Sequence, residues 1–390
     1  MAATELDQTD AASPSGGGRA GWGPVVMAAL ALPCGGQAQT STEPMGNGAV
    51  ALRWLIYEDW QPGLRRIAVS SPAFQVRTPE VGPWSLEAQL ATDSVSGASP
   101  RWHSSISGAS RMQDKRRSAD LAVSREQDQS RWTLRSAMSE ENDFRSKALS
   151  VQRRLSSDDN NRTWTVGAGT THDRIGSSDD PALDRGRRTT EVEVGITQAV
   201  SRTDLVQLTV MLSRGVGYYD DPYKRPDRRP DQRRQVIGML RWNHHAESWG
   251  VTVRNSLRLY QDSFGIRGIT AQVEPVWTPT PDVSFGPLLR YYTQRAAWFY
   301  FDPVYSFVGA PNPPGFPAAD GPASADQRLA AFGALALGFR VVLRLPDGWS
   351  SDVRLERYEQ RGSWRLGGPG SPGLLPFSAH FVQWGLTKKF

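Results

Sequence analysis

The carboxyl-terminal stretch, residues 376–390, constrains the fold more than any other part of the sequence. It reads PFSAHFVQWGLTKKF. Successive side chains of a β-strand point to opposite faces, so one face carries Val382, Trp384, Leu386 and Phe390. Alternation that ends in an aromatic residue is typical of the closing strand of an outer-membrane β-barrel, and we expect the barrel-assembly machinery to recognise it. Lys388 interrupts the apolar face, which indicates that it snorkels toward the membrane interface.

The same period-two alternation recurs along the chain from Asn47 onward. Val206, Leu208, Val210 and Leu212, for example, oppose polar residues on the other face of one strand. About ten residues of alternation are followed each time by turn residues, which predicts about sixteen strands. The sequence therefore predicts an all-β fold, a transmembrane antiparallel up-and-down β-barrel with the even strand number of a single-chain bacterial barrel.

The lengths of the predicted connections support the barrel independently. Short turns, as at 157–161 and 346–348, alternate with long loops, as at 94–117 and 297–326. Periplasmic turns and external loops of barrels differ in this way. A soluble β-sandwich also alternates, but it has no reason to sort its connections by length. Seven tryptophans lie near strand ends and are expected in the interface girdles: Trp54, Trp84, Trp132, Trp164, Trp242, Trp249 and Trp277.

Composition fits a membrane barrel better than a disordered chain. The mean hydropathy of -0.48 is hydrophilic, and the chain holds 27 Pro and 37 Gly. Disordered chains are poor in aromatic residues, whereas this chain has 14 Trp. A barrel needs apolar residues only at alternate positions, so a hydrophilic mean is compatible with it. The net charge of +5 is spread singly along strands and loops, so no nucleic-acid partner is expected.

The amino-terminal region resembles a secretory signal peptide. Arg19 precedes the apolar run 22–32, and small residues end at Ala38. We expect a cleaved signal peptide at 1–38, a short periplasmic segment at 39–47 and the barrel at 48–390. Cys34 follows Pro33, which disfavours a lipoprotein, and its removal leaves no disulfide or thiol chemistry. The expected location is the outer membrane of a Gram-negative bacterium, in contact with its lipids.

Four segments resemble one known family. They are Asp93–Pro100, Tyr219–Lys224, Leu289–Gln294 and Phe299–Asp302. In these the chain is similar to the domain-of-unknown-function 3570 family, outer-membrane β-barrels of Gram-negative bacteria with no established activity. The resemblance runs from about Asn47 to Phe390. It implies location and fold, and it supplies no catalytic residues.

The predicted interior of the barrel is rich in arginine. With the apolar face toward lipid, the candidate selectivity residues of the lumen are Arg131, Arg135, Arg254, Arg258, Arg290, Arg340 and Arg344. Basic residues that line a pore concentrate anions and set its selectivity. Arg–Glu ladders that fill a closed interior explain the same pattern, so the sequence leaves both interpretations open.

Three functions follow as hypotheses. The first is a porin-like channel or transport component with an unknown solute, and the second is a non-conducting barrel that binds a partner through its external loops. The third is a loop-sited hydrolase that uses His103 or His172, with Ser104 or Asp173 nearby. No Gly-x-Ser-x-Gly or His-Glu-x-x-His motif is present, so no enzyme is predicted. Neither a cofactor nor a metal is expected, because Asp220–Lys224 is typical of a structural turn rather than of a cation site.

Overall fold

A computed structural model describes residues 48–98, 111–224, 226–302 and 321–390. The expected signal peptide, the expected segment 39–47 and His103 lie outside these residues, and they stay predictions. Residues 99–110, in the middle of the predicted loop 94–117, also lie outside them.

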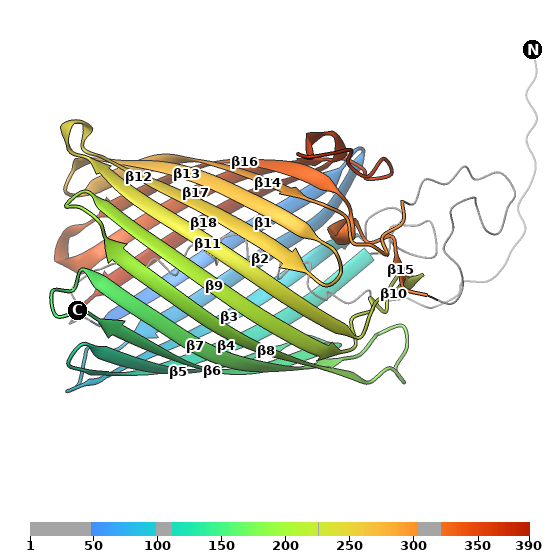
Figure 1. Cartoon of the computed structure of the whole chain (residues 1–390), viewed down its shortest axis with the longest axis horizontal. Helices are drawn as coiled ribbons and strands as arrows, with labels where there is room; N and C mark the ends of the chain where they lie inside the picture. The colour runs from blue at the N-terminus through green and yellow to red at the C-terminus, as the bar shows by residue number, and fades with distance from the viewer. Residues whose placement is uncertain (1–47, 99–110, 225, 303–320) are drawn as a thin grey trace, which may run out of the picture.

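Sixteen strands form one closed antiparallel barrel (Figure 1), which confirms the predicted fold class. They are β1 (Ala49–Gln61), β2 (Leu64–Arg77), β3 (Trp84–Ala98), β4 (Arg111–Gln127), β5 (Ser130–Glu140), β6 (Phe144–Ser156), β7 (Arg162–Ile175), β8 (Arg185–Ala199), β9 (Asp204–Gly217), β11 (Gln232–Ala246), β12 (Val251–Asp262), β13 (Arg267–Thr280), β14 (Val283–Gln294), β16 (Phe332–Arg344), β17 (Trp349–Arg361) and β18 (Phe377–Lys389). Two short strands, β10 (Asp227–Arg228) and β15 (Ala323–Ser324), pair with each other outside the barrel. Four single turns of 3-10 helix complete the described elements: η1 (Glu247–Trp249), η2 (Gln327–Leu329), η3 (Pro346–Gly348) and η4 (Gly362–Trp364).

The first and last strands close the barrel. β1 pairs with β18 in an unbroken antiparallel register from Ala49 opposite Lys389 to Trp60 opposite Ser378. An unpaired sheet edge in hydrocarbon costs several kcal/mol per exposed backbone group, so closure is a physical requirement. Val382, Trp384 and Phe390 point outward and are well exposed, as predicted for the closing strand. Lys388 lies over the ring of Trp349 at 5.4 Å, beside the η3 turn.

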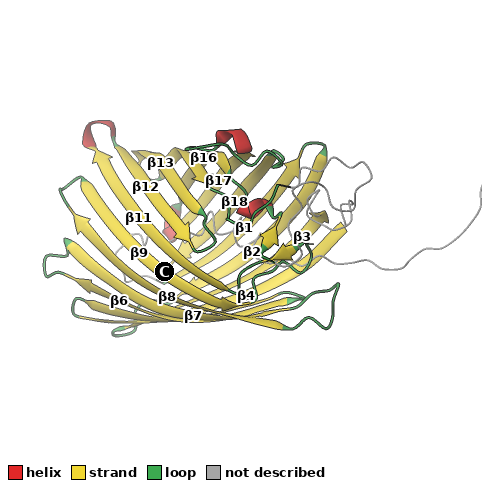
Figure 2. Ribbon diagram, turned by 45° about the vertical axis from the view of Figure 1, so that its right-hand side comes forward, coloured by secondary structure: helices red, strands yellow, loops and turns green. Residues whose placement is uncertain are grey.

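The two ends of the barrel differ in their connections. The end that holds the carboxyl terminus has only short turns between described strands, and we call it the short-turn end (Figure 1). The opposite end, the long-loop end, carries the connections 176–184, 218–231, 295–331 and 362–376. Three connections at the long-loop end are nevertheless short: 62–63, 141–143 and 263–266. Figure 2 shows the tilted strands and the short helical turns at their ends.

Several strands extend further than their apolar pattern indicates. β3 continues to Ala98 and β4 begins at Arg111, so both ends of the predicted loop 94–117 are strand. β2 also runs through Pro72, a residue that ordinarily interrupts a strand. Pro72 is paired with Trp54 on β1, whereas the ladder to β3 is interrupted between Ser70 and Ala73. The missing N–H of proline is tolerated at such an interruption.

The outward surface is apolar over much of its area. Side chains such as Ile56 and Leu355, which are 47% and 46% exposed, point away from the interior. The seven predicted girdle tryptophans all lie toward the short-turn end, so they form one rim rather than two. No helix in the described residues is long and apolar enough to cross a membrane.

Candidate functional site

The inward faces of the strands enclose a cavity of about 790 Å³. Residues from η2 and from the barrel strands β1, β6 to β9, β11 to β14 and β16 to β18 line it, because every second residue of each strand points inward. Eight arginines line the cavity: Arg154, Arg241, Arg254, Arg258, Arg290, Arg328, Arg340 and Arg354. Only Glu193 and Glu274 among the lining residues are acidic. The described wall of this cavity is therefore strongly basic.

Some of these arginines are held by neighbours across the strands. The Arg290 Nε donates to Gln272 Oε1 at 2.9 Å, and its Nη1 lies 3.5 Å from Glu356 Oε2. Arg354 also pairs with Glu356, and Arg340 lies 3.9 Å from Asp352. These contacts agree with an Arg–Glu ladder on β14 and β17.

The positive charges of other lining arginines are less well balanced by acidic neighbours. The Arg258 guanidinium stacks over the Tyr260 ring at 5.2 Å, and Arg241 donates to Gln207 Oε1 at 3.2 Å. Arg254 and Arg258 make no ion pair with a described acid. The register places Asn243 opposite Arg254 and Met239 opposite Arg258, so Arg241 on β11 lies between the two levels. These three residues form a cationic group on one wall.

Four of the seven candidate selectivity residues line the cavity: Arg254, Arg258, Arg290 and Arg340. Two others lie outside it and pair with acids, Arg131 with Glu126 at 3.2 Å and Arg135 with Asp120 at 3.0 Å. The seventh, Arg344, lies at the short-turn end, where its Nη1 donates to the Pro281 carbonyl oxygen at 2.5 Å. Arg344 does not line the cavity, because it lies at the end of β16 beside a turn, and its role in the selectivity of the lumen stays a prediction.

Four lining arginines were not among the seven candidates: Arg154, Arg241, Arg328 and Arg354. Arg154 lies on the inward face of β6, and the alternation of Val151, Arg153 and Leu155 on the outward face was a signal for it. Arg328 lies in η2, in a connection that reaches the cavity from the long-loop end. No periodic pattern in the sequence indicates that Arg328 lines the cavity.

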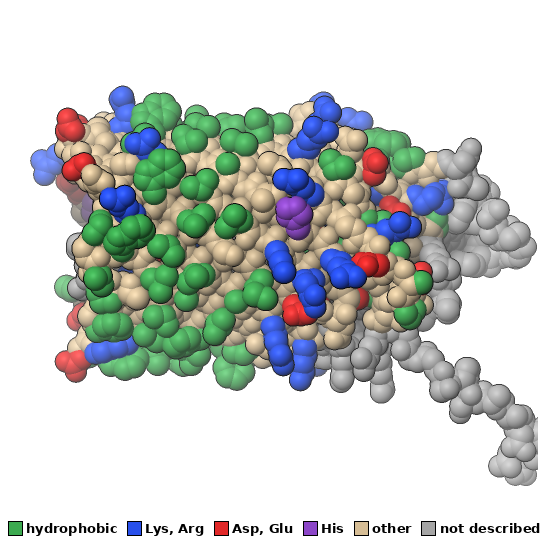
Figure 3. Space-filling view, turned by 90° about the horizontal axis from the view of Figure 1, so that it is seen from below, with side chains coloured by type: hydrophobic (Ala, Val, Ile, Leu, Met, Phe, Trp, Pro, Cys, Tyr) green, Lys and Arg blue, Asp and Glu red, His purple; other side chains and the backbone are tan. Residues whose placement is uncertain are grey.

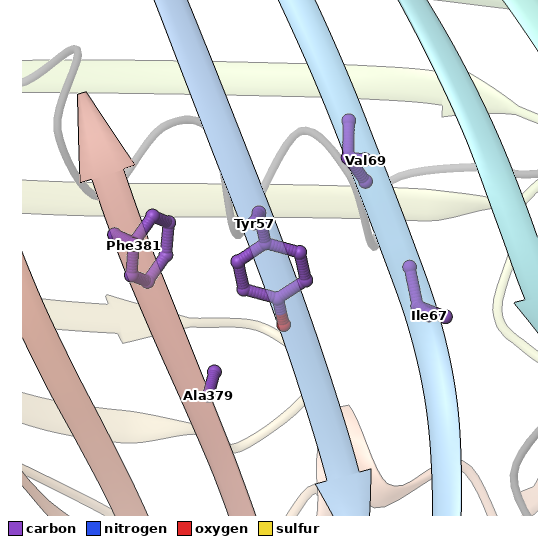
Figure 4. Packing of buried hydrophobic residues seen from close by; sticks show 5 residues of the cluster. All are labelled: Tyr57, Ile67, Val69, Ala379 and Phe381. Atoms are coloured by element: carbon purple, nitrogen blue, oxygen red, sulfur yellow. The ribbon is translucent and has the colours of Figure 1, made fainter. Parts of the chain in front are cut away.

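An apolar patch faces the cavity from the strands near the barrel closure. Tyr57, Ile67, Val69, Ala379 and Phe381 pack together across β1, β2 and β18 (Figure 4). The ring centroids of Tyr57 and Phe381 are 4.8 Å apart. The Tyr57 hydroxyl donates to Asp59 Oδ2 at 2.8 Å, which satisfies its buried polar atom. Tyr57, Ala379 and Phe381 line the cavity, so its wall is basic in one part and apolar in another.

Connections at the long-loop end join in a buried ion-pair cluster, which we call the ion-pair cap. Its members are Asp221, Lys224, Asp227, Arg229, Asp326 and Arg328. The Asp326 carboxylate is completely buried and lies 2.8 Å from Lys224 Nζ and 2.9 Å from Arg229 Nη2. It also pairs with Arg328. Buried carboxylates persist only where they are paired and hydrogen-bonded, so Asp326 organises the cap.

The Asp326 and Asp221 carboxylates of the cap are charged at neutral pH, because both have a lowered pKa. Burial alone raises the pKa of Asp326, but Arg328, Lys224 and Arg229 outweigh it and hold that pKa well below its ordinary value. Burial acts in the same way on the pKa of Asp221, and Lys224 and Arg328 lower it. Because Gln327 and Arg328 also line the cavity, the cap contacts the lumen directly.

The hydrolase candidates are separated by the strand geometry. His172 points outward on β7, whereas Asp173 points inward and pairs with Arg187 at 2.6 Å. Adjacent residues of a strand face opposite sides, so these two side chains cannot act as an acid–base pair. His244 contacts Asp204 at 2.9 Å near the short-turn end. No group of three metal-binding side chains occurs within the described residues.

The Asp220–Lys224 turn is used for structure. Asp220 Oδ1 accepts the backbone N–H of Arg229 at 2.6 Å, and Asp221 Oδ1 accepts that of Tyr223 at 3.1 Å. Asp221 also pairs with Lys224 and Arg328. These carboxylates are therefore engaged by cations and amides of the chain itself.

Comparison with known proteins identifies the family. A family model described as "Protein of unknown function (DUF3570)" matches residues 179–381. The chain belongs to this family. The match covers the strands from β8 to β17, the ion-pair cap and part of β18, and so includes most of the cavity wall. No curated protein matches the sequence.

Solved structures similar to this DUF3570 chain are bacterial outer-membrane barrels. A bacterial polysaccharide outer membrane secretin is 9% identical with a TM-score of 0.50, over 89% of this chain and 100% of the secretin. The siderophore receptor PirA from Pseudomonas aeruginosa is 10% identical with a TM-score of 0.46, over 88% of this chain and 62% of the receptor. CdiB from Acinetobacter baumannii is 10% identical with a TM-score of 0.49, over 86% and 60%. The chain thus spans about three fifths of the last two proteins, and it has a fold of the outer-membrane type.

Proposed function

We propose that this DUF3570 protein lies in the outer membrane of a Gram-negative bacterium and acts as a channel or transport component for anionic solutes. In this orientation the short-turn end faces the periplasm and the long-loop end faces the exterior. One observation carries the proposal: eight arginines against two glutamates line a cavity of about 790 Å³ inside the barrel. Basic side chains in a low-dielectric passage raise the local concentration of anions.

The apolar patch narrows the solute class. A cavity with a basic wall and an aromatic wall suits an anion that also carries an apolar part, since each part finds a complementary surface. Tyr57 and Phe381 supply the apolar surface, and Arg254 and Arg258 supply charge without a described acidic partner.

The proposal is tested by conductance of the purified protein in a planar bilayer of neutral lipid. We expect ion conduction and, in a KCl gradient, a reversal potential with the sign of chloride preference. A reversal potential with the sign of potassium preference would contradict an anion path. Absence of conductance would favour the second candidate.

The second candidate is a non-conducting barrel that binds a partner through its external loops. The ion-pair cap favours it, because it orders connections from two parts of the chain at the mouth of the barrel. The channel function and the partner-binding function are compatible if the barrel is closed without its partner and opens when the cap is disrupted.

A further inference from the structure

The outward wall of the barrel carries basic residues at a defined height. From the short-turn end, β8 presents Ile196, Val194 and Val192 outward and then Arg188. The same change from apolar to basic outward residues occurs on β9, where Leu212 is followed by Arg214, and on β11. Figure 3 shows hydrophobic side chains over one half of this face, and Lys and Arg with a His gathered toward the long-loop end.

Five of these residues form what we call the basic arc: Lys147, His172, Arg188, Arg214 and Arg234. They lie on the neighbouring strands β6, β7, β8, β9 and β11 and are exposed. Lys147 is directly opposite His172, His172 is directly opposite Arg188, and Arg214 is directly opposite Arg234. The like charges of Arg214 and Arg234 repel across their strands, so this pair costs stability unless anions bind there.

The side chains of the arc have no acidic partner among the described residues. Cations beside the arc do have one: Arg145 pairs with Glu140, and Arg174 lies 2.5 Å from Asp184. The barrel therefore neutralises the neighbours of the arc and leaves the arc itself uncompensated.

The arc lies on five neighbouring strands, and outward basic residues continue beside it on β4, with Lys115 and Arg117, and on β13, with Arg267, but not on β16 and β18. At the corresponding height β16 presents Leu335 and Gly333 outward, and β18 presents His380 and Ser378. On β17, Arg357 and Arg361 both pair with Glu359. A uniform attraction to headgroups does not require such a localised patch, whereas a discrete lipid site does.

We propose that the basic arc binds the phosphate groups of a phosphorylated lipid of the outer leaflet. The inference rests on the proposed location and orientation, which put the arc where acyl chains end and headgroups begin. The apolar residues below the arc contact the chains, and the arc supplies cations for two or more phosphates. Clusters of Lys and Arg at this level recognise anionic headgroups, with each residue contributing about 1 kcal/mol.

The test measures binding of the detergent-solubilised full chain to vesicles of neutral phospholipid that contain lipid A. The variant is Arg214→Gln with Arg234→Gln, which removes one directly opposed pair. Its matched control is Arg153→Gln with Arg162→Gln, two exposed outward arginines on β6 and β7 near the short-turn end. We expect the variant to lose about thirtyfold in affinity and the control to change little.

Three outcomes would overturn the proposal. The first is equal affinity of the wild type and the arc variant for lipid A, and the second is equal binding of the wild type to lipid A with and without its phosphates. The third is displacement of lipid A by inorganic phosphate at similar concentration, which would indicate a site for small anions. Circular dichroism of each variant verifies the fold. Conductance of the arc variant in neutral lipid separates the two proposals, because lipid binding does not depend on an anion-selective lumen.

Discussion

Replacing Asp326 with Asn is expected to destabilise the ion-pair cap by about 3–5 kcal/mol, because removal of one partner leaves buried charges uncompensated. Asp326 is fully buried and contacts Lys224, Arg229 and Arg328. Hydrogen exchange of the segments 218–224 and 321–331 measures the effect. We expect much faster exchange there and unchanged exchange in the barrel strands.

The same substitution is expected to raise the conductance, since Gln327 and Arg328 line the cavity and move when the cap opens. Asp184→Asn is the matched control, because its pair with Arg174 is exposed and contributes little. Unchanged exchange in Asp326→Asn would show that the cap does not depend on this carboxylate.

The cap also has a defined pH dependence. Cationic neighbours hold the pKa of Asp326 well below its ordinary value despite burial. A carboxylate of lowered pKa stabilises the folded state fully above its unfolded pKa of about 3.9, and this contribution is lost as the pH falls through the folded pKa. The cap should therefore stay closed at mildly acid pH and open only in strong acid.

The second large effect is expected at the outward face of the closing strand. Val382, near the middle of β18, is opposite Ile56 and Leu355, and all three point outward. Val382→Arg is expected to lower the free energy of unfolding in lipid by about 1–2 kcal/mol, because a charge inside the apolar band, below the headgroup level, loses part of its hydration. Equilibrium unfolding by urea in lipid vesicles measures it.

Val382→Ile keeps the apolar character and is the control, with little expected change. If Val382→Arg were as stable as the wild type in lipid, this face would not contact hydrocarbon, and the membrane-spanning interpretation of the barrel would fail.

The strands could be predicted from the sequence where one face must contact hydrocarbon. Val206, Leu208, Val210 and Leu212 show this requirement as alternation, and β9 contains them all. Beyond the apolar band neither face needs to be apolar, so the ends of β3 and β4 left no such signal. The run through Pro72 depended on an interruption in the ladder to β3, which one strand alone cannot reveal.

The candidate site was predictable to the same extent. Arg254 and Arg258 lie on a regular strand, and alternation identifies their inward face. The pairing of Arg229 with Asp326 joins residues 97 positions apart, through connections without periodicity. Such contacts depend on the closed barrel, which brings the two connections to the same mouth.

The most direct test of the anion path is the reversal potential of Arg254→Gln with Arg258→Gln in a KCl gradient at low ionic strength. Arg214→Gln with Arg234→Gln is the control, because it removes the same charge from the outward face of neighbouring strands. At ionic strength near 0.1 M charges act over about 10 Å, so only the inward pair should influence ions in the lumen. We predict a clear shift away from chloride preference for the inward variant and none for the outward one. Equal shifts in both variants, or no shift in the inward variant, would contradict an anion path through the arginine-lined cavity.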